Sequence, residues 1–138
     1  MEPCEICGRP GQRHHIVFRS QGGMNIRVNF AYLCAEHHTD GPAAVHNCRE
    51  LDLRLKVRLQ RELEAMFRNE YYCIGEIAAA VGYDRRRLAK RMSKVRTRAG
   101  RIQREDIVRF FMGGRLYDEL RRPPEPEREE TEGFEFIK

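Results

Sequence analysis

Cysteine and histidine residues gather in the first fifty positions at spacings that are typical of metal binding. Two residues separate Cys4 from Cys7, and two residues separate Cys34 from His37. This gap lets both side chains of a pair face one ion, so two pairs brought together by folding make a tetrahedral Cys3His site. In a chain too short for a large core, bound zinc supplies folding energy. We predict a structural zinc site; the alternative is that these cysteines are loose or buried thiols.

Two adjacent histidines stand outside these pairs. His14 and His15 run directly into Ile16, Val17 and Phe18, whose β-branched and aromatic side chains predict a short strand. Neighbouring residues on a strand point to opposite faces, so His14 and His15 cannot do the same job without local distortion. If the strand twists or ends there, one can bind an ion while the other contacts a water molecule. Phosphodiester hydrolysis needs a base that takes a proton from water and a positive centre. A neutral imidazole, with a pKa of about 6.5, can act as such a base or bind a metal.

The segments CEIC, HHIVFRSQGG and NFAYLCAEHH, with a later VH, resemble the HNH endonuclease family over about residues 4–50. The resemblance implies a ββα-metal fold that cleaves or nicks DNA with a bound divalent ion. Position by position, it implies that His14 is a ligand of that ion and that His15 is the general base. It also implies that Asn29 is the motif asparagine, with a main-chain carbonyl near it orienting the base. The alternative is a purely structural zinc finger with spare histidines.

The remaining ligand of the catalytic ion has two candidates. Many members of the family end with two histidines four residues apart, but Pro42 stands four residues after His38 and the next histidine is His46. The resemblance therefore leaves open whether His38, His46 or both bind the ion, and whether that ion is Mg²⁺, Mn²⁺, Ni²⁺ or Zn²⁺. His37 stands where the family usually has cysteine, and zinc accepts either ligand. Some phage-encoded members end similarly, which implies a phage or prophage origin.

Charge is distributed unevenly along the chain. Residues 1–70 carry ten Lys/Arg and nine Asp/Glu, a net +1, whereas residues 71–122 carry fourteen and six, a net +8. A basic segment beside a near-neutral one indicates a nucleic-acid surface, and the partner we expect is DNA. The candidate contacts lie on a basic helix that is predicted to end near Gly100: Arg85, Arg86, Arg87, Lys90, Arg91 and Lys94. The alternative is a small helical bundle with a solvated basic face.

Helical patterns follow the cysteine-rich segment. An apolar residue recurs every four positions between 50 and 68, which predicts a helix, although alternating leucines there also suit a strand. This stripe consists of Leu51, Leu55, Leu59, Leu63 and Phe67. The next unit has the appearance of a helix-turn-helix, with one helix closed by Gly82 and the basic helix capped by Asp84. A third helix is predicted over QREDIVRFFM, before Gly113.

The predicted fold class is α+β in three parts. Residues 1–70 form a zinc-stabilised ββα-metal nuclease domain, residues 71–122 form a basic helical DNA-docking module, and residues 123–138 form an acidic disordered tail. The aromatic end of that tail is a possible site for a protein partner. No segment predicts a membrane span or an export signal, so we expect a cytoplasmic protein, in a bacterial host if phage-encoded.

The function predicted from these features is metal-dependent DNA endonuclease activity. Two alternatives remain from the sequence. One is a non-catalytic DNA-binding protein built from a zinc finger and a helix-turn-helix. The other is a packaging or recombination accessory nuclease that is active only with a partner.

Overall fold

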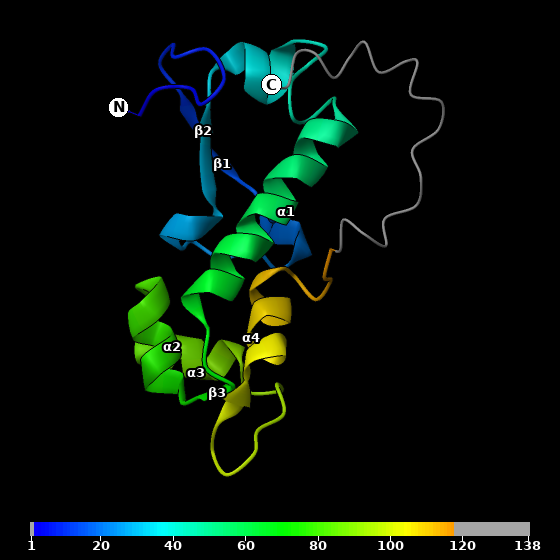
Figure 1. Cartoon of the computed structure of the whole chain (residues 1–138). Helices are drawn as coiled ribbons and strands as arrows, with labels where there is room; N and C mark the ends of the chain where they lie inside the picture. Colours follow the sequence, from blue (N-terminus) through cyan, green and yellow to red (C-terminus); the bar gives the residue numbers. More distant parts are fainter. Residues whose placement is uncertain (1, 118–138) are drawn as a thin grey trace.

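The computed structural model describes residues 2–117 and has an α+β architecture with two small sheets (Figure 1). The predicted acidic tail at 123–138, with its aromatic end, lies outside the described residues. The elements in chain order are β1 (Gln12–His15), η1 (Arg19–Gln21), η2 (Arg27–Asn29), β2 (Phe30–Leu33), η3 (Glu36–Asp40), α1 (Arg49–Met66), β3 (Tyr71–Tyr72), α2 (Ile74–Val81), α3 (Arg85–Arg91), β4 (Ile102–Gln103) and α4 (Arg104–Phe111).

The first sheet is an antiparallel hairpin of β1 and β2, in which His14 lies opposite Ala31 and His15 opposite Phe30. The strand predicted to run through Phe18 ends at His15, because Ile16 and Val17 turn into the core and are fully buried. The backbone directly before β2 forms a tight helical turn, η2. Because β1 ends at its second histidine, the chain can leave the sheet directly after the two candidate site residues.

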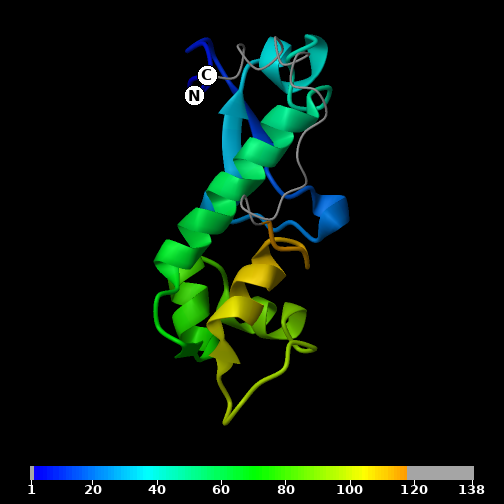
Figure 2. The same ribbon diagram turned by 45° about the vertical axis from the view of Figure 1, so that its right-hand side comes forward.

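Helix α1 is the long central element of the molecule (Figures 1 and 2). The apolar stripe predicted between 50 and 68 is buried along its whole length, so the helical interpretation is confirmed and the strand alternative is wrong. The hairpin and η3 lie toward one end of α1, whereas α2, α3 and α4 gather at the other end. Neither α1 nor any other helix within residues 2–117 is long and apolar enough to cross a membrane.

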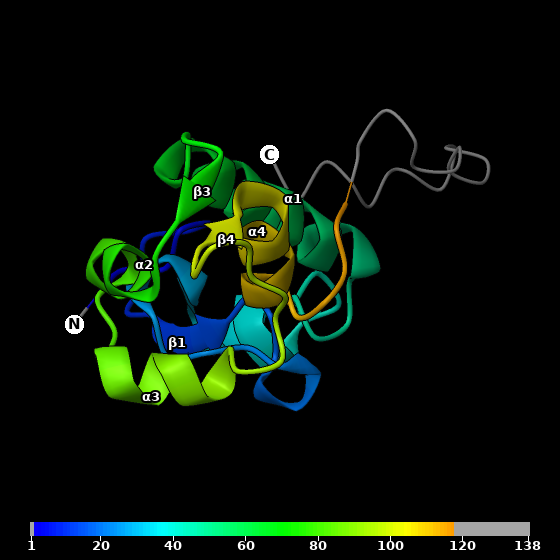
Figure 3. The ribbon, with the colours of Figure 1, turned by 90° about the horizontal axis from the view of Figure 1, so that it is seen from below.

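Helices α2 and α3 pack on each other, and α4 packs on α1 (Figure 3). Gly82 ends α2 in the left-handed conformation, with φ +74°, as the sequence predicted. The Asp84 side chain accepts a hydrogen bond from the Arg87 N–H at 2.9 Å and caps α3. Ala78 is buried where the two helices meet, and Leu88 of α3 is fully buried. Strands β3 and β4 pair antiparallel and bracket the two helices in the sequence.

The basic helix is shorter than predicted. Helix α3 ends at Arg91, and the next residue, Met92, points into the core. The chain then forms an irregular loop that closes where Arg98 and Arg101 pair, with Gly100 at φ +78°. Met92 leaves the helical conformation, with ψ 14°, so Lys94 lies on the loop and not on α3.

Several contacts join the three C-terminal helices to the rest of the chain. Arg104 donates to the carbonyl oxygens of Phe67 and Glu64 at the end of α1. Gln60 and the backbone of Tyr117 exchange two hydrogen bonds of 2.6 Å each. Buried side chains from the hairpin, α1, α2, α3 and α4 form one continuous core. The division at residue 70 stays a prediction, since a continuous core does not show whether the two halves fold separately.

A glycine contact completes this junction. Gly113 follows α4 and has φ +80°. A Cβ added at Gly22 would lie 3.6 Å from the Cα of Gly113. A Cβ added at Gly113 itself would collide with the Gln21 carbonyl oxygen and come within 3.0 Å of Val17 Cγ1. The turn after α4 therefore packs, backbone against backbone, on the turn that follows β1.

We expect Gly113→Ala to destabilise the chain more than Gly114→Ala does. Both glycines have positive φ, and the left-handed conformation costs an alanine roughly 1–2 kcal/mol. A Cβ at Gly114 meets nothing within 4 Å, so Gly114→Ala is a control for the backbone effect alone. The collision at Gly113 adds about 1–3 kcal/mol, as overpacking usually does. Denaturant unfolding of both variants measures the difference, and equal losses would contradict the close packing of this junction.

Candidate metal centres

Cys4, Cys7, Cys34 and His37 converge at one end of the molecule, as the sequence predicted. The first two lie in the turn before β1, Cys34 follows β2, and His37 lies in η3. Cys7 Sγ is 3.6 Å from Cys34 Sγ, and His37 Nδ1 is 3.6 Å from Cys4 Sγ and 3.3 Å from Cys34 Sγ. A tetrahedron with Zn–S bonds of about 2.3 Å has edges of about 3.6–3.8 Å. The cluster could therefore hold a metal such as zinc.

The surroundings of this Cys3His cluster favour the charged form of two of its three sulfur ligands. Although burial raises it, N–H groups of the surrounding backbone lower the pKa of Cys4 to about 6. The backbone N–H and the guanidinium of Arg9 lower the pKa of Cys7, with Arg9 Nε 3.3 Å from its sulfur. Burial raises the pKa of Cys34. Metals bind the thiolate form, and donors aimed at ligand sulfurs stabilise that form.

A second cluster unites three histidines. The ligand nitrogens of His14, His38 and His46 lie within 4.8 Å of one another, and their ring centroids are 4.8–5.3 Å apart. His14 comes from β1, His38 from η3 and His46 from the loop before α1. His38 and His46 were the two candidates for the remaining ligand, and both lie beside His14. The three histidines can offer nitrogen ligands to one ion.

His14 is the buried member of this three-histidine cluster, with 2% of its surface exposed. Burial, assisted by the nearby His38 and His46, lowers the pKa of His14 to about 3, so its ring is neutral at physiological pH. Its Nε2 atom is buried and has no hydrogen-bond partner within residues 2–117. A buried polar atom without a partner is costly and calls for a missing ligand or ion. A metal ion at the three-histidine cluster would satisfy it.

Neighbouring side chains hold the other two rings. Gln12 Oε1 lies 2.8 Å from His38 Nδ1 and fixes that ring, while burial lowers the His38 pKa. The Phe18 ring is stacked on His46, with a centroid distance of 5.5 Å and an angle of 12°. Lys56 of α1 lies 5.1 Å from the Phe18 ring centre and is held by Asp52 at 3.0 Å. Residues from β1, the following loop and α1 therefore surround the cluster.

His15 points away from this cluster, as strand alternation requires. Its Nε2 lies 2.6 Å from Asn25 Oδ1, and its ring meets the Phe30 ring at 5.1 Å. The prediction that a main-chain carbonyl near Asn29 orients His15 is wrong, because the side chain of Asn25 makes that contact. Sequence reasoning missed Asn25, because the resemblance concerned only the motif asparagine and a single exposed asparagine in a loop carries no spacing signal.

Asn29 instead fastens the loop between the strands. Its Oδ1 accepts from the Val17 N–H at 2.8 Å, and its Nδ2 donates to the Val17 and Met24 carbonyl oxygens at 3.1 and 3.0 Å. The side chain is 1% exposed and all of these bonds are buried. Asn29 thus acts on the backbone that follows the two histidines rather than on a histidine ring.

The six predicted DNA contacts are all exposed: Arg85, Arg86, Arg87, Lys90, Arg91 and Lys94. Arg87 lies 5.7 Å from the centre of the Tyr83 ring. Within residues 2–117, none of the six is in an ion pair, whereas Arg96 on the following loop is paired with Asp106 at 2.9 Å. Five of them lie on α3, and their charges face solvent.

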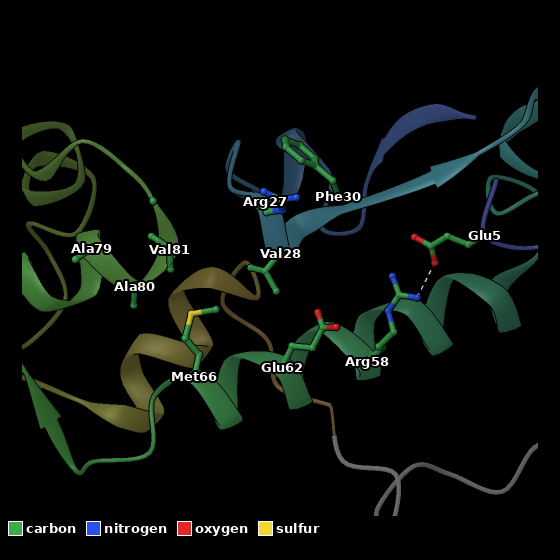
Figure 4. A pocket seen from close by; sticks show the side chains of 11 residues that line it. Glu5, Arg27, Val28, Phe30, Arg58, Glu62, Met66, Ala79, Ala80 and Val81 are labelled. Carbon is green, nitrogen blue, oxygen red and sulfur yellow. Dashed lines mark hydrogen bonds and ion pairs between the residues drawn. The ribbon is translucent and has the colours of Figure 1, made fainter. Parts of the chain in front are cut away.

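A groove of about 900 Å³ lies between η2, α1 and α2 (Figure 4). Val28, Phe30, Met66 and the end of α2 line it, and Arg58 at its edge pairs with Glu5 at 2.7 Å. No residue of the two metal clusters and none of the predicted DNA contacts lines this groove. We therefore assign the candidate chemistry to the clusters and not to the groove.

We expect the purified chain to hold close to one tightly bound zinc ion at the Cys3His cluster. Cys34→Ser should release it and loosen the hairpin end, because the ion joins the turn before β1 to η3 through the four ligands. Cys48→Ser is the matched control, since Cys48 is a half-buried free cysteine outside both clusters. Elemental analysis and circular dichroism measure the two effects. Wild-type protein without tightly bound zinc would contradict this assignment.

Comparison of the chain with protein-family models, with curated proteins and with solved structures gave no match.

Proposed function

We propose that this chain is a metal-dependent endonuclease of the HNH type that cleaves or nicks DNA. One observation carries the proposal: His14, His38 and His46 converge apart from the Cys3His cluster, and the buried Nε2 of His14 has no partner in the described part of the chain. A purely structural zinc finger accounts for the first cluster and leaves the second unexplained. The resemblance of the motifs around His14, His15 and Asn29 to that family supports the same function.

The three-histidine cluster suits a catalytic divalent ion. Imidazole donors favour Zn²⁺ or Ni²⁺, whereas Mg²⁺ prefers oxygen ligands, so this donor set ranks the ions that the sequence left open. Lowered pKa values keep His14 and His38 neutral and their nitrogens available. When bound, the ion would polarise a phosphate oxygen and stabilise the charge that develops on phosphorus and on the leaving oxygen.

His15 takes the role of general base in this proposal. It removes a proton from a water molecule as the water oxygen bonds to phosphorus and the bond from phosphorus to the leaving oxygen breaks. Strand alternation separates its ring from the three-histidine cluster, and β1 ends at His15, so the proposal requires that one phosphate group reach both across the end of the strand. Asn29 supports this arrangement indirectly, because its bonds fix the backbone at Val17 and Met24.

The helical module supplies affinity for DNA. Five exposed cations on the short helix α3, without acidic partners among the described residues, form a surface that suits phosphate groups. This surface also favours a second candidate function, a non-catalytic DNA-binding protein. A cleavage assay separates the two, because only the first requires the three-histidine cluster and His15.

Supercoiled plasmid incubated with the full chain should be nicked or linearised when Ni²⁺, Mn²⁺ or Zn²⁺ is added, and EDTA should stop the reaction. His15→Ala should lower the cleavage rate about a hundredfold to ten-thousandfold, as loss of a general base does. Zinc content and DNA affinity of the variant should stay close to wild type, since His15 belongs to neither metal cluster. Cleavage by His15→Ala at the wild-type rate would refute the assignment of the base. Binding without cleavage under any of these ions would favour the non-catalytic candidate.

A charge-matched pair of double variants tests the docking surface. Arg86→Gln with Lys90→Gln removes two exposed cations from α3, and Arg54→Gln with Arg68→Gln removes two exposed cations elsewhere. If the α3 residues contact phosphates, the slope of log affinity against log salt should fall by roughly 1.8, about 0.9 for each contact. The control should keep the wild-type slope. Affinity should fall on every duplex sequence; equal slopes in both double variants would contradict docking through α3.

A further inference from the structure

We propose that Asn25 is a positioning residue that fixes His15 as the Nε2–H tautomer, leaving Nδ1 as the nitrogen that accepts a proton. This inference rests on the proposed function for its catalytic meaning, but the tautomer itself is a property of the free protein. The contact that points to it is the 2.6 Å distance between His15 Nε2 and Asn25 Oδ1.

The amide oxygen of asparagine is only an acceptor, so the histidine nitrogen facing it must carry the hydrogen. A neutral imidazole has one N–H, and the other nitrogen then holds a lone pair. His15 Nδ1 has no hydrogen-bond partner within residues 2–117, and it is not among the buried atoms that lack one. The lone pair is therefore on the nitrogen that solvent or a substrate water can reach.

The backbone around Asn25 is held firmly although the residue itself is exposed. Its neighbours Met24 and Ile26 are both buried, at opposite ends of a short turn. The Met24 carbonyl oxygen accepts from Asn29 Nδ2 at 3.0 Å and from the Ile26 N–H at 2.9 Å. Asn29 thus fixes the segment that carries Asn25, and Asn25 in turn fixes His15.

The His15 ring is also held from a second side. Phe30, the residue opposite His15 in the β1–β2 register, meets it edge-on, with centroids 5.1 Å apart and planes at 87°. The aromatic contact sets the plane of the ring but does not choose which nitrogen bears hydrogen. Only the Asn25 oxygen makes that choice, so removing it should change the tautomer while leaving the ring in place.

Nitrogen NMR of the zinc-loaded full chain at mildly alkaline pH measures the tautomer directly. We expect wild-type His15 to give the pattern of a single Nε2–H tautomer. Asn25→Ala should give a mixture of tautomers, and Asn25→Asp, which keeps an acceptor oxygen, should restore the single one. Asn69→Ala is the control, because Asn69 is an exposed asparagine on the link between α1 and β3. A wild-type Nδ1–H tautomer, or an unchanged pattern in Asn25→Ala, would overturn the proposal.

Kinetics then separate positioning from folding. Asn25→Ala should lower kcat about tenfold to a hundredfold, as loss of an orienting partner typically does, with DNA affinity and zinc content unchanged. Asn25→Asp should recover most of that loss. If the wild type does not cut DNA but shows the predicted tautomer, the proposed function fails while the contact stands. If the wild type cuts and Asn25→Ala has the same kcat, the positioning role fails alone.

Discussion

The side-chain amide of Asn29 joins two backbone segments that neither sheet nor helix holds, and much of the candidate site depends on it. Its three buried hydrogen bonds fix Val17, just beyond the two histidines of β1, and Met24, just before Asn25. In the segment after Val17, Phe18 stacks on His46. The turn at Gly113 packs against Val17 and Gln21. Loss of a buried hydrogen-bonding group leaves its partners unsatisfied, at a cost of about 1–3 kcal/mol for each. One carboxamide therefore connects the hairpin, the three-histidine cluster and the helical module.

The two histidine neighbours of β1 illustrate how a small fold separates roles. His14 is buried and neutral, and its Nε2 has no hydrogen-bond partner among the described residues. His15 is half-buried and is hydrogen-bonded to Asn25 in the loop between the strands. The strand places them on opposite faces and ends at the second of them. The Cys3His cluster is formed by the segment before β1 and the segment after β2 of the same hairpin. A hairpin of four-residue strands can therefore bring together two candidate metal-binding clusters, because each draws residues from turns as well as strands.

Sequence reasoning succeeded where a residue's role depends on spacing along the chain. Within each of the pairs Cys4–Cys7 and Cys34–His37, the two-residue gap brings both ligands to one place, and the two pairs lie together as predicted. The stripe from Leu51 to Phe67 is buried because its period matches that of a helix. It failed where no local signal marks the structure. The basic helix ends at Arg91 although residues 92–98 contain no glycine or proline that would signal a stop. Asn25 was missed for the same reason, since only the folded loop brings it to His15.

The packing of Gly113 on the turn after β1 has a consequence for how such a chain can be recombined. A nuclease part and a DNA-docking part are often regarded as exchangeable cassettes joined by a linker. Here the turn after α4 returns to touch Val17 and Gln21, and Arg104 and Tyr117 bond to α1. A chimera joined near residue 70 would remove these contacts from the hairpin and α1. A replacement module would also need a glycine at the position of Gly113, because a Cβ there collides with the Gln21 carbonyl oxygen. Replacing the exposed side chains of α3 therefore disturbs the fold less than replacing the whole helical module would.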